Sequence, residues 1–385
     1  MKATGQAKHC QHGHWRYNKV HPSLASRLRM RETFMVVSLL FLLMLAGCGT
    51  PQSQWEVLQT GRGARMLALT TDPHNQEALY AGSDTGQVYR AFADNASSPA
   101  TSQGIPSGTR VDALLADPQA AGVVYAGTNN GLFRSHDYAV NWAPYGKGLP
   151  VDTITALASA SQGVLLAGML RNGVYFSHDG GATWARAVLP AFTSVNTLLC
   201  VIAACYAGLN QSQAETNLYI THDDGQTWTP EATGQAEAVY ALAALVITSQ
   251  AKRAGQTLLF AGTSHGLLVS MDGGASWHAD ATGLPGGAVT ALGRYPAQPD
   301  WLLAGVNNAV YRSTDDGRHW SALAPESNGL SAPVAAIAVA TGQQSGAVVY
   351  VAAGQLARYP AASGGGNPIA SIIALLVALA ILPLV

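Results

Sequence analysis

Ser177-His178-Asp179-Gly180-Gly181-Ala182-Thr183-Trp184 is one copy of a motif that recurs along this chain. The pattern S/T-x-D-x-G-x-x-W returns at residues 221–228, 270–277 and 313–320, and a variant with Ala139 in the glycine place spans residues 135–142. Successive motif tryptophans are 42, 44, 49 and 43 residues apart. A period of about 40 to 50 residues built from short strands is typical of β-propellers, so the spacing predicts that fold.

Each period contains the same succession of short β-rich segments. An apolar segment such as residues 154–158 is followed by an aromatic residue or leucine and Ala-Gly, as in Tyr125-Ala126-Gly127. A Val/Leu/Tyr segment and the segment after the tryptophan complete the unit. Four strands per unit and seven units predict an all-β, seven-bladed β-propeller with four-stranded blades over residues 55–359. We expect the first strands to line a channel and the small Ala-Gly pairs to let neighbouring sheets pack closely.

The two ends of this region predict how the ring closes. Trp55-Glu56-Val57-Leu58 resembles the segments that follow Trp142, Trp228 and Trp277, which are expected fourth strands. The last unit, ending near Tyr359, has neither a motif nor a tryptophan after it. We therefore expect the N-terminal strand to complete the seventh blade, which would leave no exposed sheet edge there.

Composition disfavours some classes of partner. Charged residues make up only 11% of the 385-residue chain, and no basic block is present. From Cys48 onward the chain holds 14 Lys and Arg against 21 Asp and Glu. An acidic excess favours solubility and disfavours an anionic polymer, so we expect no nucleic-acid binding.

The N-terminal region has the features of an export signal. Three arginines at 27, 29 and 31 precede an apolar run over residues 35–45, which ends in Leu45-Ala46-Gly47-Cys48. This ending resembles a bacterial lipobox, so we predict a signal region at 1–47, lipidation of Cys48 and a short linker at 48–54. Met30 is an alternative start, which would place residues 1–29 outside the protein. An uncleaved membrane helix is the competing interpretation.

The C-terminal region changes composition after Tyr359. A Gly-rich linker at 360–367 leads into residues 368–385, which carry no charge. Eighteen residues are about long enough to cross a bilayer as a helix, so we predict a transmembrane anchor. A sorting tail that is removed, or an apolar helix packed on a partner, are the alternatives. With the lipid, this predicts a protein anchored on the outer side of the bacterial cytoplasmic membrane.

Two cysteines remain beyond the signal region. Cys200 and Cys205 flank a predicted hairpin turn. Outside the cytosol they could form a disulfide across the turn, whereas the other interpretation is two small apolar core residues. The sequence leaves both open.

The repeated motif resembles the Asp-box, or BNR repeat, of sialidases, sortilin-type receptors, xyloglucanase-type glycosidases and photosystem II assembly factor-like propellers. In such a turn the aspartate accepts hydrogen bonds from its own backbone, the glycine adopts positive φ and the tryptophan packs beneath. The resemblance implies that these turns lie away from the ligand face and are structural. The residues concerned are Asp137, Trp142, Asp179, Gly181, Trp184, Asp223, Gly225, Trp228, Asp272, Gly274, Trp277, Asp315, Gly317 and Trp320.

No catalytic, metal or cofactor site is evident in the sequence. The arginine-containing segment typical of sialidases is absent, and no spacing of acids selects a glycosidase pair. No nucleophile elbow, zinc-binding helix motif or phosphate-binding loop is present. His136, His178 and His222 occupy one motif position on different blades, too far apart to share a metal. We expect no cofactor and favour a protein without enzymatic activity.

The channel face opposite the motifs is the predicted binding face. It should be formed by the turns between second and third strands and by the links that lead into first strands. The candidate residues are Arg62, Arg65, Arg110, Asn129, Asn130, Arg171, Asn172, Asn210, His265, Asn307 and Asn308. Asparagine is also a common turn former, which is the competing explanation for its recurrence. The predicted function is a non-catalytic scaffold that binds a protein, peptide or glycan; the alternative is a sialidase-like or xyloglucanase-like glycoside hydrolase acting on extracellular glycans.

Overall fold

The computed structural model describes residues 55–58, 63–94, 102–189, 194–201, 204–210, 217–231, 233, 238–246, 256–279, 281–296, 298, 300–324, 330–343 and 345–360. The predicted signal region, the lipidation site Cys48, the candidate Arg62 and the apolar tail lie outside these residues. In the part of the chain so described, no helix is long and apolar enough to cross a membrane. The export and anchoring hypotheses therefore remain predictions.

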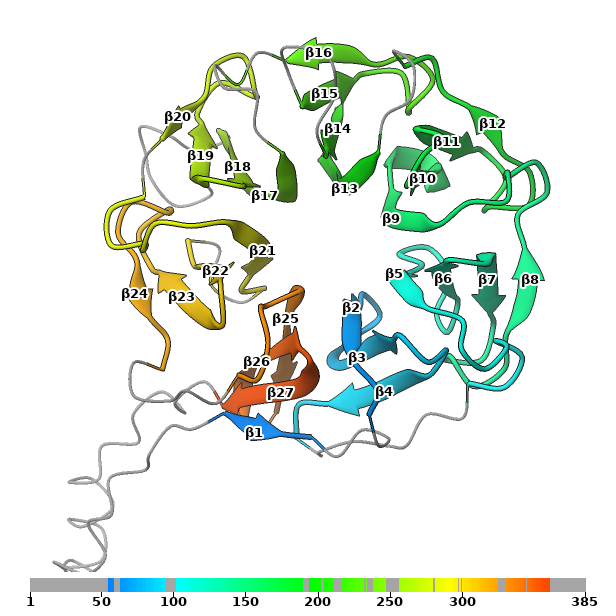
Figure 1. The fold of residues 1–385 in the computed structure, drawn as a ribbon, viewed down its shortest axis with the longest axis horizontal. Helices are drawn as coiled ribbons and strands as arrows, with labels where there is room; N and C mark the ends of the chain where they lie inside the picture. The colour runs from blue at the N-terminus through cyan, green and yellow to red at the C-terminus, as the bar shows by residue number, and fades with distance from the viewer. Residues whose placement is uncertain are drawn as a thin grey trace, which may run out of the picture. The chain divides into compact units, whose positions relative to one another are not determined.

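The structure is an all-β seven-bladed propeller (Figure 1). The innermost strands are β2 (Met66–Asp72), β5 (Val111–Ala116), β9 (Ile154–Ser159), β13 (Val195–Val201), β17 (Val239–Val246), β21 (Val289–Arg294) and β25 (Ala336–Gly342). The second strands are β3 (Asn75–Ser83), β6 (Val124–Thr128), β10 (Leu165–Met169), β14 (Ala204–Leu209), β18 (Thr257–Thr263), β22 (Leu302–Val306) and β26 (Gly346–Ala353).

The outer strands complete the blades. The third strands are β4 (Val88–Phe92), β7 (Gly131–Ser135), β11 (Val174–Ser177), β15 (Leu218–Thr221), β19 (Gly266–Ser270), β23 (Ala309–Ser313) and β27 (Gln355–Pro360). The fourth strands are β8 (Ala143–Tyr145), β12 (Ala185–Arg186), β16 (Thr229–Glu231), β20 (His278–Ala279), β24 (Ser321–Ala322) and β1 (Glu56–Val57). A short 3-10 turn, η1 (Ser161–Gly163), joins β9 to β10. Six sheets have four strands, and the sheet β2–β3–β4 has three within the described residues.

The N-terminal strand closes the ring as predicted. β1 pairs with β27, with Glu56 opposite Arg358 and Val57 opposite Ala357. Arg358 Nε donates to Glu56 Oε2 at 2.7 Å, and the N–H of Leu58 donates to the carbonyl of Leu356 at 2.8 Å. The first and last described strands therefore share one blade, which leaves no open edge on β27.

The Ala-Gly pairs fit neighbouring blades together. A Cβ added at Gly127 would lie 2.6 Å from Ile154 Cγ2 at the start of the next blade's first strand. The same close approach to a Val or Ile of the next blade occurs at Gly82, Gly168, Gly208, Gly262 and Gly305. In the seventh blade the corresponding residue is Ala352. It belongs to the same core cluster as Met66, which starts the next blade and is not β-branched. Only glycine leaves room for a β-branched neighbour at this distance, because protein interiors are close-packed.

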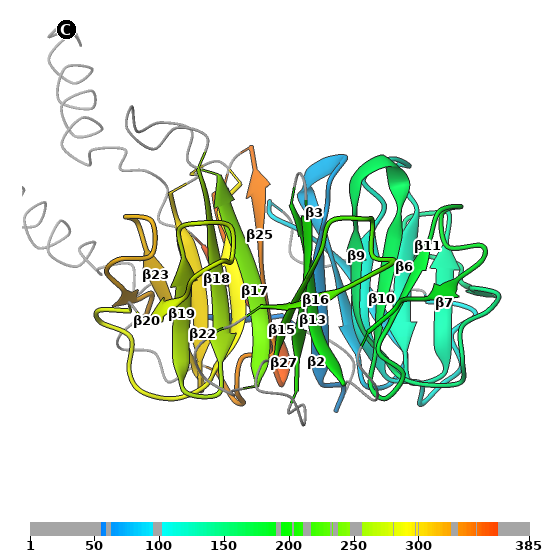
Figure 2. The same cartoon turned by 90° about the horizontal axis from the view of Figure 1, so that it is seen from above.

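The two ends of the channel are built from different loops (Figure 2). At one end, the turns between second and third strands bond to the links that lead into first strands, as in Asn129 N–H to the Arg110 carbonyl at 3.1 Å. We call this end the loop face. At the other end the hairpins between first and second strands meet the motif turns, as in Ser161 Oγ to Asp224 Oδ1 at 3.1 Å. We call this end the motif face.

Candidate functional site

The motif turns use their polar groups internally. Asp179 Oδ1 accepts from Ser177 Oγ at 2.8 Å and from the Thr183 N–H at 2.9 Å, and its Oδ2 accepts from Thr183 Oγ1 at 2.6 Å. Trp184 Nε1 donates to the carbonyl of Gly181 at 2.8 Å. Equivalent carboxylate bonds hold the turns of Asp137, Asp223, Asp272 and Asp315. These carboxylates are occupied as turn acceptors, which leaves little capacity for catalysis.

The same bonds stabilise the charged form of the carboxylates. The hydroxyl and N–H of Thr183 lower the pKa of Asp179 to about 2. The hydroxyl and N–H of Ser276 lower the pKa of Asp272 to about 2. An acid with so low a pKa stays ionised at neutral pH and is a poor proton donor, in contrast to the raised pKa of a general acid.

The motif turns also join neighbouring blades. The Tyr125 hydroxyl in the second blade donates to the carbonyl of Gly180 in the third at 2.9 Å, and Tyr206 donates to Gly273 at 2.8 Å. A Cβ at Gly274 would lie 3.2 Å from Tyr206 Cε1. The motif glycine thus provides positive φ and also makes room for the aromatic ring of the preceding blade.

A second recurring segment binds three of the motif turns from outside, and it was missed in the sequence. The N–H of Trp184 donates to the Lys147 carbonyl at 2.9 Å, and a Cβ at Gly148 would lie 2.6 Å from the Trp184 carbonyl oxygen. Gly104-Ile105-Pro106 and Gly283-Leu284-Pro285 occupy the same place beside Trp142 and Trp320. The recurring Gly-Leu/Ile-Pro triplet was the signal that could have identified this contact.

Three arginines of the loop face have fixed backbones. Arg65 N–H donates to Asp84 Oδ1 at 2.9 Å, and Arg110 N–H donates to Asn129 Oδ1 at 2.7 Å. Arg171 N–H donates to Asp152 Oδ2, also at 2.9 Å. These arginines belong to the first three blades of the ring, and all three are exposed.

Buried Asp152 organises the third of these positions. It accepts bonds from the Asn172 side chain at 2.8 Å and from the Thr153 N–H at 2.8 Å, besides Arg171. Burial alone would raise the pKa of Asp152, but the bonds from Arg171, Asn172 and Thr153 outweigh it, so its pKa lies below the usual value. The Arg171 side chain is 74% exposed and contacts Asp152 only through Nε, at 3.3 Å.

Some of the other predicted binding-face residues form hydrogen bonds that hold their turns, and most of them are exposed. Asn129 and Asn172 hold their turns through side-chain bonds. The carbonyl of Asn307, which has φ of 53°, accepts from the Val334 N–H. Exposed residues at this end are Asn129, Asn130, Asn210, His265, Asn307 and Asn308. These residues belong to the second to sixth blades, so they lie around the ring rather than in one cluster.

Exposed apolar side chains accompany Arg171, and the sequence did not single them out. Val151 is 94% exposed and Leu170 is 39% exposed. The N–H of Leu170 donates to the carbonyl of Thr153 at 2.9 Å, so the two segments lie together. Arg171, Val151 and Leu170 therefore form an apolar and cationic patch at the third blade, which we call the blade-3 patch.

The central channel contains two cavities. One, of about 250 Å³, is lined near the loop face by residues that include Asp112, Thr155, Asn196, Tyr240 and Thr290. The second, of about 530 Å³, lies toward the motif face. Among the described residues that line either cavity, Asp112 is the only carboxylic acid. Burial raises the pKa of Asp112, while its bonds to Arg110 Nε, at 2.7 and 3.0 Å, oppose that rise.

Polar residues of the first cavity connect adjacent blades. Thr155 Oγ1 donates to the Val195 carbonyl at 2.5 Å, and Thr290 Oγ1 donates to the Val334 carbonyl at 2.6 Å. Asn196 Nδ2 donates to the carbonyl of Val239 at 3.1 Å. These side chains serve as structural links across the inner ring.

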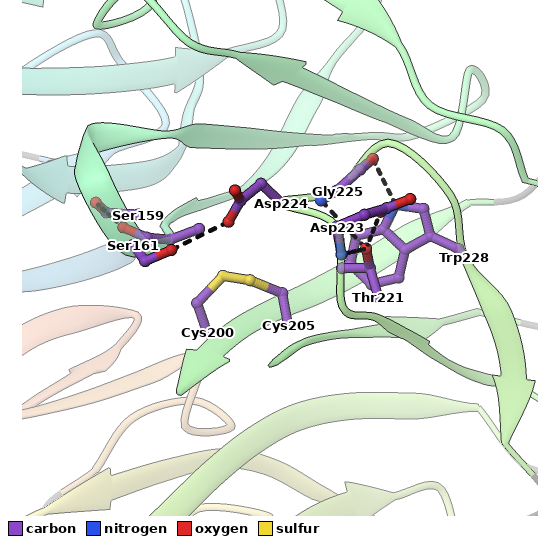
Figure 3. The surroundings of a disulfide bond; sticks show 10 residues. Ser159, Ser161, Cys200, Cys205, Thr221, Asp223, Asp224, Gly225 and Trp228 are labelled. Atoms are coloured by element: carbon purple, nitrogen blue, oxygen red, sulfur yellow. Dashed lines mark hydrogen bonds between the residues drawn. A yellow bond between two sulfur atoms is a disulfide. The ribbon is translucent and has the colours of Figure 1, made fainter. Parts of the chain in front are cut away.

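Cys200 and Cys205 form a disulfide in the structure (Figure 3). They lie opposite each other in the pair β13–β14, and Cys200 lines the larger cavity. The disulfide lies at the motif face, near Ser161 and Asp224 (Figure 3). No group of three or more His, Cys, Asp or Glu that could hold a metal occurs among the residues that the structure describes.

Comparison with known proteins defines the family and the fold. The DUF6242 beta propeller domain matches residues 54–297. No curated protein matches the chain in sequence. The GH74 xyloglucanase from Xanthomonas campestris is similar in structure, with a TM-score of 0.56 and 20% identity over 82% of this chain and 55% of that one. The chain thus spans about half the length of that enzyme.

Propellers of about the same length as this domain are similar too. YCF48 from Cyanidioschyzon merolae has a TM-score of 0.58 and 14% identity, over 79% of this chain and 98% of that one. A structure of YCF48 bound to D1 peptide has a TM-score of 0.55 and 14% identity, over 80% of this chain and 97% of that one. At these identities the likeness establishes the fold alone.

Proposed function

The chain belongs to the DUF6242 beta propeller domain family, and we propose that it is a non-catalytic scaffold whose loop face binds an acidic peptide or protein segment. The observation that carries this proposal is the set of backbone-fixed arginines Arg65, Arg110 and Arg171 on successive blades. A cation on a fixed backbone loses less conformational entropy when it binds a ligand than one on a flexible loop.

The guanidinium groups retain donors for a partner. Arg110 bonds to Asp112 and Arg171 bonds to Asp152 through Nε alone. Neither uses its Nη groups in a hydrogen bond to a described residue. Guanidinium groups bind carboxylates through two parallel bonds, so these donors suit acidic side chains. Exposed Val151 and Leu170 add apolar area beside Arg171, which favours a peptide over a small inorganic anion.

The channel gives weaker support to the glycosidase alternative. Hydrolysis by the common two-carboxylate mechanisms requires two acids on opposite sides of the bond. Among the described residues that line the two channel cavities, Asp112 is the only carboxylic acid, and it forms an ion pair with Arg110. YCF48, a propeller of similar structure, has been solved bound to D1 peptide, which supports the proposal of a peptide ligand.

We further propose that the motif turns are Asp-box repeats and that the protein is exported and membrane-tethered. Their internal bonding supports the first proposal. The disulfide between Cys200 and Cys205 supports the second, because stable disulfides are characteristic of oxidising compartments. The predicted lipid on Cys48 and the apolar residues 368–385 would provide two attachments. Intact-mass measurement of the protein from membranes tests both attachments.

The binding proposal is tested with the triple substitution R65A/R110A/R171A. The partner is first captured by crosslinking on cells that produce the wild-type protein, and its affinity is then measured with purified components. Exposed ion pairs contribute up to about 1 kcal/mol each, so the triple variant should bind about tenfold to a hundredfold more weakly. The control is R318A, which removes an exposed cation from the motif face. Unchanged affinity of the triple variant, or equal loss in the control, would contradict the proposal.

A further inference from the structure

The larger central cavity has the composition of a ligand site. It has a volume of about 530 Å³, within the usual range of small-molecule pockets. Five of the seven innermost strands contribute to its wall, namely β2, β13, β17, β21 and β25. It lies on the motif-face side of the channel, so it is separate from the arginines of the loop face.

The wall is mainly aliphatic and partly exposed. Leu69, Leu199, Leu242, Leu292 and Ile337 line the cavity, and each is only half-buried. Four of them, all but Leu199, also line the smaller cavity and so form an apolar belt between the two. Apolar surface left facing water favours a ligand that covers it.

Arg294 is the only charged side chain among the described residues of this wall. Its Nη1 donates to the Ala244 carbonyl at 3.1 Å, across the boundary between two blades. It forms no ion pair with a residue that the structure describes. Arg294 is exposed to the channel, and the cavity wall covers part of its side chain, which lowers its pKa.

An aliphatic wall with one arginine indicates which class of ligand the cavity would bind. A guanidinium has five N–H donors, and Arg294 uses one in a described bond. A carboxylate would satisfy two more and neutralise the charge. We propose that this cavity binds a small aliphatic carboxylate, with its carboxylate on Arg294 and its hydrocarbon chain against the apolar belt. We call it the Arg294 cavity.

The disulfide fixes one side of the Arg294 cavity. Cys200 lines the cavity and is joined to Cys205 across the hairpin of the fourth blade. The bond therefore limits how far the neighbouring wall residues Leu199 and Val201 can move. A pre-formed pocket of this kind binds without first having to be ordered.

The test uses octanoate, octan-1-ol and acetate as probes in titration calorimetry of the purified propeller. Octanoate should bind at least about tenfold more tightly than the uncharged alcohol, since a hydrogen bond to a charged group has that effect, and more tightly than acetate, which lacks the chain. R294Q should abolish the preference for octanoate over octan-1-ol. R294K should restore part of it, and R318Q should leave it unchanged.

A second variant tests the proposal independently in case R294Q does not fold. L199W fills the cavity from another blade and should weaken octanoate binding while Arg294 remains in place. Thermal melting establishes that each variant is folded. The proposal is overturned if octanoate fails to bind at millimolar concentration, if octan-1-ol binds equally well, or if folded R294Q binds octanoate like the wild type. Because the loop face is unchanged in these variants, partner binding there should persist in all of them.

Discussion

Replacing Gly262 by alanine tests how the blades are packed. Gly262 ends the Ala-Gly pair of β18, and its φ is not positive, so alanine is compatible with the backbone. A Cβ there would lie 2.5 Å from the Val289 carbonyl oxygen and 2.9 Å from Val289 Cγ1. Because the nearer atom belongs to the backbone of the next blade, a side-chain rotation cannot relieve the clash.

Two opposing contributions decide whether G262A raises or lowers the free energy of unfolding. Overpacking a close-packed core costs about 1–3 kcal/mol. Replacing glycine by alanine at a compatible φ stabilises by about 0.4–1 kcal/mol, because it restricts the unfolded chain. We therefore expect G262A to lower the free energy of unfolding by roughly 1–2 kcal/mol. Each kcal/mol should lower Tm by about 2 °C, because the shift is small for a domain of this size.

The assay is urea or thermal unfolding followed by circular dichroism, with G286A as the matched control. Gly286 also has no positive φ, and a Cβ there would meet nothing within 4 Å. G286A should therefore be neutral or slightly stabilising. Equal stability of the two variants, or a gain in G262A, would refute the packing explanation for the Ala-Gly repeat.

Two further predictions concern stability. Because the folded pKa of Asp179 and Asp272 is about 2, below the unfolded value of about 3.9, their stabilising contribution should be complete above about pH 4 and decline as the pH falls toward 2. Urea unfolding between pH 6 and 2 measures this decline, and D179N should flatten it; an unchanged slope would contradict the assigned bonds. Loss of the disulfide in C200S/C205S should cost about 2 kcal/mol from loop-closure entropy alone. A reductant should lower Tm of the wild type but not of the double variant, and a reductant effect on both would point to another cause.

The repeated motifs predicted the architecture because each depends on local chemistry. Asp179, Gly181 and Trp184 interact within eight residues, so their order in the chain determines the turn. The Ala-Gly pairs likewise predicted close packing between sheets. The resemblance of residues 55–58 to fourth strands correctly predicted that β1 closes the ring. The fourth strand that four-stranded blades predict for the first blade, after β4, is not among the strands of the described residues.

The arrangement of the loop face was harder to predict because it depends on contacts between segments far apart in the sequence. Asp84, Asn129 and Asp152 are ordinary turn residues in the sequence, and only the fold shows that they fix three arginines. Val151 and Leu170 gave no pattern, since exposure depends on how the links cross the blade. Arg294 ends an apolar strand and looks like an ordinary exposed terminus, and only the fold shows that it lines a cavity with residues of four other blades. The sequence therefore predicted which loops meet at this end of the propeller but not which of their residues contact one another.

Site-specific photo-crosslinking from both faces tests the central claim most directly. A photoreactive residue would be placed singly at Val151 and Leu170 in the blade-3 patch, and at exposed Met271 and Tyr138 in the motif turns. The account predicts a discrete crosslinked partner from the blade-3 patch, reduced when Arg65, Arg110 and Arg171 are replaced by alanine, and none from the motif turns. Crosslinks to that partner from the motif turns alone would contradict the assignment of the loop face as the binding surface.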